Sequence, residues 1–184
     1  MNHPSKIRIW EPLLTLVLLG VAVVYMTNVF NTGNWLWFQG RATNVRPARI
    51  VVVDQGQRTV LTSGHAYFNV LADATEESLS KLGNTDLVGI GLSNQTLQDY
   101  ASDSLVLELY FDEPIQFNTM SRVGTPTQLL IPIKGRHADG GYVFRGQNGD
   151  WWFGALRMAD PTPLYDALTQ MGYTAVPQRP INSG

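Results

Sequence analysis

The longest hydrophobic run of the chain lies near its beginning, in residues 12–30 (PLLTLVLLGVAVVYMTNVF). It holds no charged residue, and its clearly polar side chains are Thr15, Thr27 and Asn28. A helix that rises about 1.5 Å per residue needs roughly 20 apolar residues to cross a hydrocarbon core of about 30 Å. The run therefore predicts a transmembrane helix that anchors the chain in the lipid bilayer.

Three other interpretations of this run are possible. A buried core helix is usually shorter and carries a polar face, which these residues lack before Thr27. A cleaved signal peptide shares the basic start, here Lys6 and Arg8, but it should end at small residues, whereas bulky and aromatic residues follow. An amphipathic surface helix needs Lys or Arg along one face, and the run has none. An uncleaved anchor is the favoured interpretation.

The charges on either side of the run predict which way it crosses the membrane. Residues 1–11 carry two basic side chains and one acidic side chain, which favours a cytoplasmic N-terminal tail. Three arginines between residues 41 and 49 weaken the contrast, but long domains cross largely regardless of their charge. Trp10 before the run and the aromatic residues within 35–38 after it fit the aromatic belts of the two interfaces. The C-terminal domain is therefore expected outside the cytoplasm, on a single-pass membrane protein.

The pattern changes after the hydrophobic run. Residues 31–48 end at a proline and an alanine, and we expect them to form a stalk with little internal order. Short strands and two longer helices follow, which predicts one extracytoplasmic domain over residues 49–175. The last residues, 176–184, are expected to be a loose tail.

Alternation of apolar and polar residues predicts a sheet in this domain. In residues 105–111 (LVLELYF) every second side chain lies on one apolar face. Helices are predicted after Thr62 and Ser63, ending near Leu82, and after the Asp160-Pro161 pair. Helices on one face of a mostly antiparallel sheet make an α+β fold, with the other sheet face left for water or a partner. The remaining predicted elements are strands at 49–54, 58–61, 115–118, 128–133, 142–145 and 151–156, a weak strand at 87–92, and a brief helix capped by Ser93.

Composition excludes several classes of function. The chain has 184 residues and no cysteine, which removes disulfides, thiolate nucleophiles, zinc–thiolate sites and iron–sulfur clusters. The net charge of −2 provides no basic field for nucleic acid. No phosphate-binding glycine loop follows a predicted strand. We therefore expect no cofactor, no metal and no nucleic-acid partner.

Two histidines are the candidates for catalysis. His137 lies two residues from Asp139, and an imidazole beside a carboxylate can serve a hydrolase as a general base. The same residues precede two glycines and are also ordinary turn chemistry, which is the favoured interpretation. His65 is expected near a helix start, in a capping or surface role. Because no Gly-x-Ser-x-Gly elbow and no HExxH motif is present, we do not expect an enzyme.

Aromatic side chains gather on the last two predicted strands. Trp151 and Trp152 are adjacent, so their side chains must point to opposite faces of the sheet. We take Trp151, in step with the phenylalanine that follows two positions on, as the core residue. Trp152 is then the exposed one, with Tyr142, Arg145 and Arg157 around it as a predicted binding site, because Trp, Tyr and Arg dominate interface hot spots.

The sequence as a whole favours a membrane-anchored, non-enzymatic accessory or interaction protein whose domain binds a protein partner in or at the membrane. The alternative is a sensor or binding domain for a small ligand of the cell envelope, and a membrane-tethered hydrolase is the third hypothesis. A deep pocket beside Trp152 would favour the ligand, and a flat apolar patch would favour the partner. Convergence of His65, His137 and a carboxylate would favour the enzyme.

Overall fold

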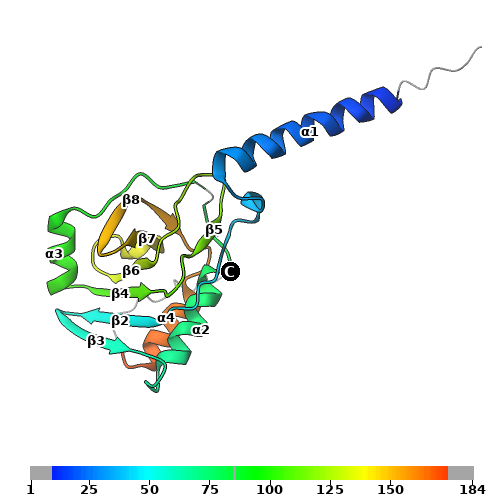
Figure 1. Cartoon of the computed structure of the whole chain (residues 1–184). Helices are drawn as coiled ribbons and strands as arrows, with labels where there is room; N and C mark the ends of the chain where they lie inside the picture. The colour runs from blue at the N-terminus through cyan, green and yellow to red at the C-terminus, as the bar shows by residue number, and fades with distance from the viewer. Residues whose placement is uncertain (1–9, 85, 174–184) are drawn as a thin grey trace, which may run out of the picture.

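Helix α1 (Trp10–Thr32) projects from the rest of the chain in the computed structural model, which describes residues 10–84 and 86–173 (Figure 1). It has 23 residues, and Val29 is the one buried residue along it. By length and composition α1 is apolar enough to cross a membrane, a property that anchors and signal sequences share. The predicted tails lie almost entirely outside the described residues.

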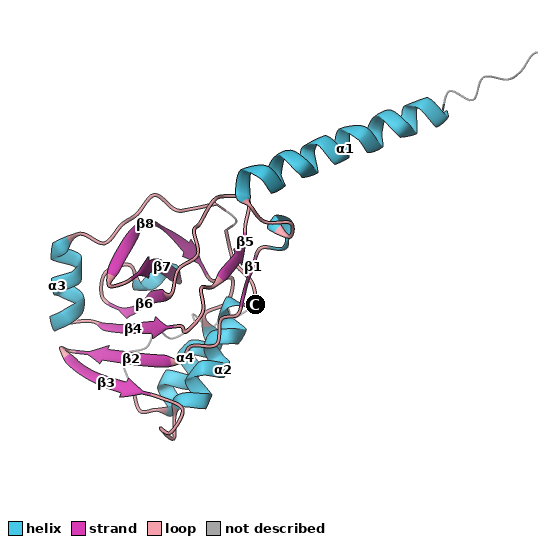
Figure 2. Cartoon of the chain, in the orientation of Figure 1, coloured by secondary structure: helices cyan, strands magenta, loops and turns pink. Residues whose placement is uncertain are grey.

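A six-stranded antiparallel sheet with the order β3-β2-β4-β6-β7-β8 forms the centre of the domain (Figure 2). Its strands are β2 (Arg49–Asp54), β3 (Gln57–Leu61), β4 (Leu105–Tyr110), β6 (Gln128–Lys134), β7 (Tyr142–Gln147) and β8 (Asp150–Arg157). Asn148 and Gly149, between β7 and β8, both have positive φ, as a tight hairpin turn requires. The α+β class and the antiparallel sheet predicted from the sequence are thereby confirmed.

Helices cover both faces of the sheet. On one face, α2 (Phe68–Leu79) and α4 (Thr162–Gln170) pack on the main core, which includes Leu105, Leu107 and Leu109 of β4. On the other face, Tyr100 of α3 (Asn94–Ser102) packs on a smaller core with Val106 and Phe144. The expectation of one core-facing side is wrong. Because polar side chains alternate with the apolar ones in β4, its sequence did not indicate a second apolar layer, to which the other strands of the sheet contribute most of the residues.

The segment expected to be a stalk is folded against the domain. It contains the short helix η1 (Trp37–Gln39) and strand β1 (Arg41–Thr43), which pairs antiparallel with β5 (Gln116–Asn118). Arg46 then binds Asp73 and Glu76 of α2 at 2.5 Å and 2.9 Å. The folded region therefore starts well before Arg49. No local sequence pattern predicted strand β1, because its partner strand β5 lies far along the chain.

Helix boundaries follow the hydrogen bonds at their ends. The first domain helix starts at Phe68 and not after Ser63, because residues 62–67 form turns in which the His65 amide donates to the Thr62 carbonyl at 2.8 Å. Ser93 caps α3 as predicted, accepting from the Thr96 amide at 3.1 Å.

The weak strand predicted at 87–92 does not form as a strand; a single bridge, between Val88 and Ala155, forms there. A second short helix, η2 (Ala138–Gly140), precedes β7.

Candidate functional site

The four predicted site residues lie in two separate pairs on β7 and β8. Arg157 is exposed, lies 5.0 Å from the ring centre of Tyr142, and donates to the Tyr142 hydroxyl at 2.9 Å. The guanidinium of Arg145 lies 5.8 Å from the ring of Trp152. Because Tyr142 and Arg145 are three positions apart on one strand, they point to opposite faces. The structure therefore does not bring the four residues into one patch.

Arg145, expected on an exposed patch, is buried, with 2% of its surface exposed. Its guanidinium donates to the carbonyl of Val123 and, at 3.0 Å each, to the carbonyls of Phe153 and Gly154. Burial lowers the pKa of Arg145 to about 10. Its Nε has no hydrogen-bond partner among the residues that the structure describes. Arg145 thus ties the segment before β6 and the middle of β8 to β7, and it is not available to a partner.

The two tryptophans do point to opposite faces, but neither belongs to the main core. Trp151 is half-buried against the smaller core, and Trp152 is half-buried over Gly124, where an added Cβ would lie 2.6 Å from its ring. Leu156, in step with Trp152, is the residue that enters the main core. The assignment of Trp151 as the main-core residue is therefore wrong. Phe153 is 72% exposed, beside a register shift in the pairing of β7 and β8, an irregularity of the kind that re-aims side chains.

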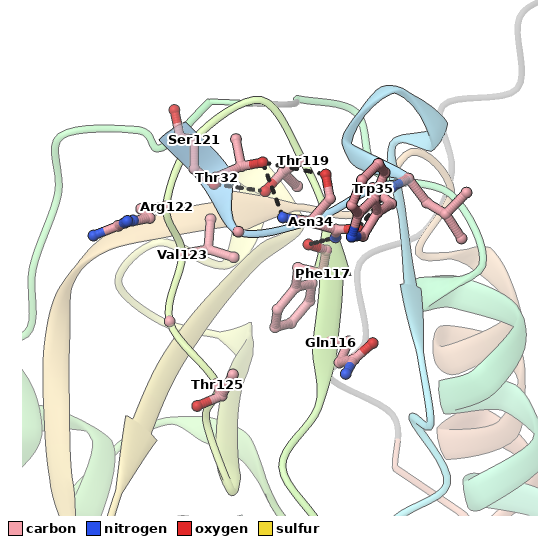
Figure 3. A pocket seen from close by; sticks show the side chains of 13 residues that line it. Thr32, Asn34, Trp35, Gln116, Phe117, Thr119, Ser121, Arg122, Val123 and Thr125 are labelled. Atoms are coloured by element: carbon pink, nitrogen blue, oxygen red, sulfur yellow. Dashed lines mark hydrogen bonds between the residues drawn. The ribbon is translucent and has the colours of Figure 1, made fainter. Parts of the chain in front are cut away.

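A pocket of about 420 Å³ lies where α1 meets the domain, and we call it the junction pocket (Figure 3). It is lined by residues 32–36, by Gln116, Phe117 and Thr119, and by residues 121–125. Figure 3 shows Trp35 and Arg122 on opposite sides of it. Gly124, over which Trp152 packs, forms part of its wall. The pocket is therefore next to the predicted aromatic site, although it opens at the end of α1.

Asn34 holds the junction pocket together. Its side-chain amide donates to the Asn118 side chain at 2.7 Å and to the Phe117 carbonyl at 3.1 Å, and its oxygen accepts from the Leu36 amide at 2.8 Å. Asn118 is itself buried and donates to the Gln39 side chain at 3.1 Å. These bonds join the chain just after α1 to strand β5. The direction in which α1 leaves the domain is therefore set by specific contacts.

Two arginines, one in the lining and one behind it, give the junction pocket a positive environment. Arg122 lines it, and its Nε donates to the Asn31 carbonyl at the end of α1 at 3.0 Å. The buried Arg145 lies behind the wall, bound to the Val123 carbonyl. Asp86 contacts the lining through Ser121, and its pKa is lowered first by the hydrogen bond from Ser121, at 2.5 Å, and then by that from the Leu87 amide. No Asp or Glu is among the residues that line the pocket.

An apolar groove of about 500 Å³ runs along α1, and we call it the anchor groove. One face of α1 and two aromatic residues of η1 line it, namely Val17, Gly20, Val21, Val24, Tyr25, Trp37 and Phe38. An added Cβ on Gly20 would meet nothing within 4 Å, so the groove is open at that point. The Tyr25 hydroxyl donates to the Trp35 carbonyl at 2.8 Å, which fixes the aromatic segment beside the helix.

The candidate hydrolase residues have other partners. The Nδ1 of His137 lies 2.9 Å from the Tyr100 hydroxyl, which also donates to the Arg136 carbonyl at 2.9 Å. Burial, and next the charge of Arg136, lower the pKa of His137. Asp139 lies in η2, and none of the hydrogen bonds among the described residues joins it to His137. Within residues 10–84 and 86–173, no three His, Asp or Glu side chains gather to hold a metal ion.

Comparison with known proteins does not assign a role to any of these residues. No family model, no curated protein and no solved structure matches the chain. Both the junction pocket and the anchor groove were missed from the sequence, because the residues after α1 were assigned to a stalk. The sequence signal that could have indicated them was two glycines beside polar residues, Gly33 and Gly124, which lie in the lining of the pocket and have positive φ in the structure.

Proposed function

We propose that this chain is a membrane-anchored, non-enzymatic accessory protein that binds a protein partner in the membrane. The observation that carries the proposal is the combination of an apolar, uncovered α1 with an ordered junction to the domain. A helix that is hydrophobic all round is stable in a lipid environment and is unfavourable in water. The bonds from Asn34 and Arg122 then make the domain follow any tilt or rotation of its anchor.

The anchor groove supports a partner inside the bilayer. Helices associate in lipid where small residues let their backbones approach, because the hydrophobic effect does not drive association there. Gly20 offers such a position at the open centre of the groove, with Trp37 and Phe38 at one end. A transmembrane helix of a partner protein fits this arrangement. Its contact with both α1 and η1 would link the partner to the domain.

Photocrosslinking tests this partner. A photoreactive residue in place of Val21, inside the groove, is compared with one in place of Leu19, which is also exposed but lies outside the groove lining. The full chain in its native membrane should give a discrete protein adduct from position 21 and little from position 19. Gly20→Leu should remove the adduct, whereas Ala22→Leu should keep it. Equal adducts from both positions would contradict a partner in the groove.

The orientation that we propose places the N-terminus in the cytoplasm and the domain outside it, following the charges that flank α1. A reporter fused after Gly184 should be active only if it works outside the cytoplasm. The chain should also stay in the membrane pellet after alkaline carbonate extraction, with its N-terminus intact. A mature N-terminus beyond Thr32 would identify α1 as a cleaved signal sequence and overturn the anchor.

A small ligand of the cell envelope is the second candidate, and one observation favours it. The junction pocket has the size of a ligand site and lies directly behind the Gly124 wall that Trp152 covers. A hydrolase gains no such support, since the Nδ1 of His137 is bonded to Tyr100. The two candidates are compatible, because Trp35 and Leu36 line the pocket, whereas Trp37 and Phe38 line the groove.

A further inference from the structure

We propose that the junction pocket binds the headgroup of an anionic phospholipid, with the lipid phosphate held by Arg122. This inference rests on the proposed anchoring of α1 in a membrane. It assigns a ligand class to a pocket that the partner in the anchor groove does not use. Three features support it: where the pocket opens, which polar groups it offers, and which charges surround it.

The pocket opens at the level where lipid headgroups would lie. Residues 32–36 form one of its walls, and α1 ends at Thr32, so a membrane-spanning α1 places this wall at the membrane surface. Trp35 and Leu36 line the pocket and are also exposed, with 60% of Trp35 accessible. Tryptophan favours the headgroup region, and the aliphatic side chain beside it suits the upper part of the acyl chains. An amphiphile can therefore contact the rim and the interior together.

The lining offers hydrogen-bond groups that are free to accept a ligand. Among the described residues, the side chains of Gln116 and Thr125 have no hydrogen-bond partner, and Arg122 uses only its Nε, which leaves both terminal nitrogens unpaired. A guanidinium binds a phosphate through charge-assisted, often paired hydrogen bonds. Hydroxyl and amide groups suit the hydroxyls of a phosphoglycerol headgroup. In Figure 3, Arg122 lies at the opposite end of the pocket from Trp35.

The charge balance favours an anion. Arg122 lines the pocket next to Val123, whose carbonyl accepts from the buried Arg145, and no carboxylate is among the described residues of the lining. Asp86, an acid that contacts the lining, is exposed and accepts a hydrogen bond from the Ser121 hydroxyl. Arg122 lines the pocket directly, whereas Asp86 contacts the lining only through Ser121. Water also screens the exposed Asp86 more than the buried Arg145, so both differences favour a positive potential inside the pocket.

Lipid binding by the full chain in detergent micelles tests the proposal. Native mass spectrometry would count phosphatidylglycerol molecules bound, in competition with phosphatidylcholine and with soluble glycerol phosphate. We expect preferential binding of one phosphatidylglycerol, weakened about tenfold by Arg122→Gln through loss of a charge-assisted contact. Thr125→Trp, which fills the pocket without removing charge, should also weaken it. Arg136→Gln, a change of an arginine outside the pocket, should have no effect.

Each other outcome overturns the inference in a recognisable way. Equal binding of both lipids, with no effect of Arg122→Gln, would show that the pocket is not a site for anionic headgroups. Competition by glycerol phosphate at the same concentration would make the ligand a soluble phosphate compound and not a lipid. In both cases membrane retention after carbonate extraction would be unchanged, so the proposed anchoring would stand. If the unaltered chain were not retained in the membrane pellet, the proposed anchoring itself would be refuted. A thermal melt of each variant checks that it is folded.

Discussion

The buried side chain of Arg145 joins three segments of the chain, namely β7, the middle of β8 and the segment before β6. Three backbone carbonyls accept its guanidinium hydrogens, and the charge stays buried although its pKa falls to about 10. Lysine carries the same charge but offers no planar set of donors, so it cannot satisfy three carbonyls in these directions. The geometry of the guanidinium, more than its charge, is what the fold uses.

We therefore predict that Arg145→Lys lowers the free energy of unfolding by roughly 3 kcal/mol, the usual cost of breaking a buried charged network. Arg136→Lys, at a half-exposed position, should cost less than about 1 kcal/mol. Urea unfolding of the full chain in mild detergent, followed by tryptophan fluorescence, measures both. If Arg145→Lys were as harmless as Arg136→Lys, the buried bonds would have no structural role.

Phe144 and Phe153 are predicted to behave in opposite ways, although both lie on the strands of the aromatic cluster. Phe144 is fully buried, so Phe144→Ala should cost about 3–5 kcal/mol. Phe153 is mostly exposed, so Phe153→Ala should cost less than about 1 kcal/mol. The same unfolding measurement compares them. A large loss from Phe153→Ala would show that its packing over Gly91 matters more than its exposure indicates.

His137 predicts a pH dependence of stability. Its folded pKa lies below the ordinary value of 6.5, first because of burial and then because of Arg136. As the pH falls through 6.5, the unfolded chain binds a proton that the folded chain does not, so this group makes stability fall on acidification. His137→Asn keeps a residue that tolerates the positive φ of this position. Melting temperatures between pH 7.5 and 5.5, about one unit on either side of the histidine pKa, should fall less in the variant than in the parent chain, and an identical decline would contradict the role of His137.

At the scale of elements, the junction between α1 and the domain depends on Asn34. Asn34→Ala removes bonds to Phe117, Asn118 and Leu36, so α1 should become free to swing. The chain has no cysteine, so a pair of introduced cysteines can be spin-labelled without background, one at Met26 and one at Glu113. Pulsed distance measurements should give a narrow distribution for the parent chain and a broad one for the variant. Equal widths would show that the junction is held by other contacts.

The elements that the sequence predicted are those that a local pattern defines. The alternation in β4, the Asn148-Gly149 turn and the Ser93 cap each depend on residues close together in the chain. Strand β1 was missed because its three residues carry no alternation, and they become a strand by pairing with β5. The second apolar layer was missed because β4 contributes one buried apolar residue to it, Val106, and the other strands of the sheet supply most of the rest.

The candidate site was harder to predict than the fold, for a related reason. Tyr142, Arg145, Trp152 and Arg157 were grouped by proximity along a hairpin, but the alternation of the strands and the burial of Arg145 separate them. The exposure of a side chain depends on which distant segments of the chain pack against it. The sequence did not show that the segment with Val123 would pack on Arg145 and accept its hydrogen bond. The junction pocket combines stretches whose closeness only the folded chain establishes.

At the scale of the whole molecule, α1 contributes little to the stability of the domain. Val29 is its one buried residue, and the bond between Arg122 and the Asn31 carbonyl is a surface contact. A chain starting at Asn34 is therefore predicted to fold in water without detergent, with a loss of unfolding free energy of about 1–2 kcal/mol for the missing contacts. Circular dichroism and thermal melts would measure this. A chain that fails to fold would show that α1 belongs to the core.

The junction also dictates an order of events during synthesis. Asn34 bonds to a residue 84 positions further along, so the contact waits until β5 has left the ribosome. By then α1 has long been available to the membrane, and β1 has had no partner strand. If α1 is an anchor, as proposed, anchoring comes first and the junction pocket comes late, because the pocket needs the finished domain. A chain that stops before β5 could still enter a bilayer but would present neither the pocket nor a fixed direction to anything that binds it, so a partner that recognises the junction would select completed copies.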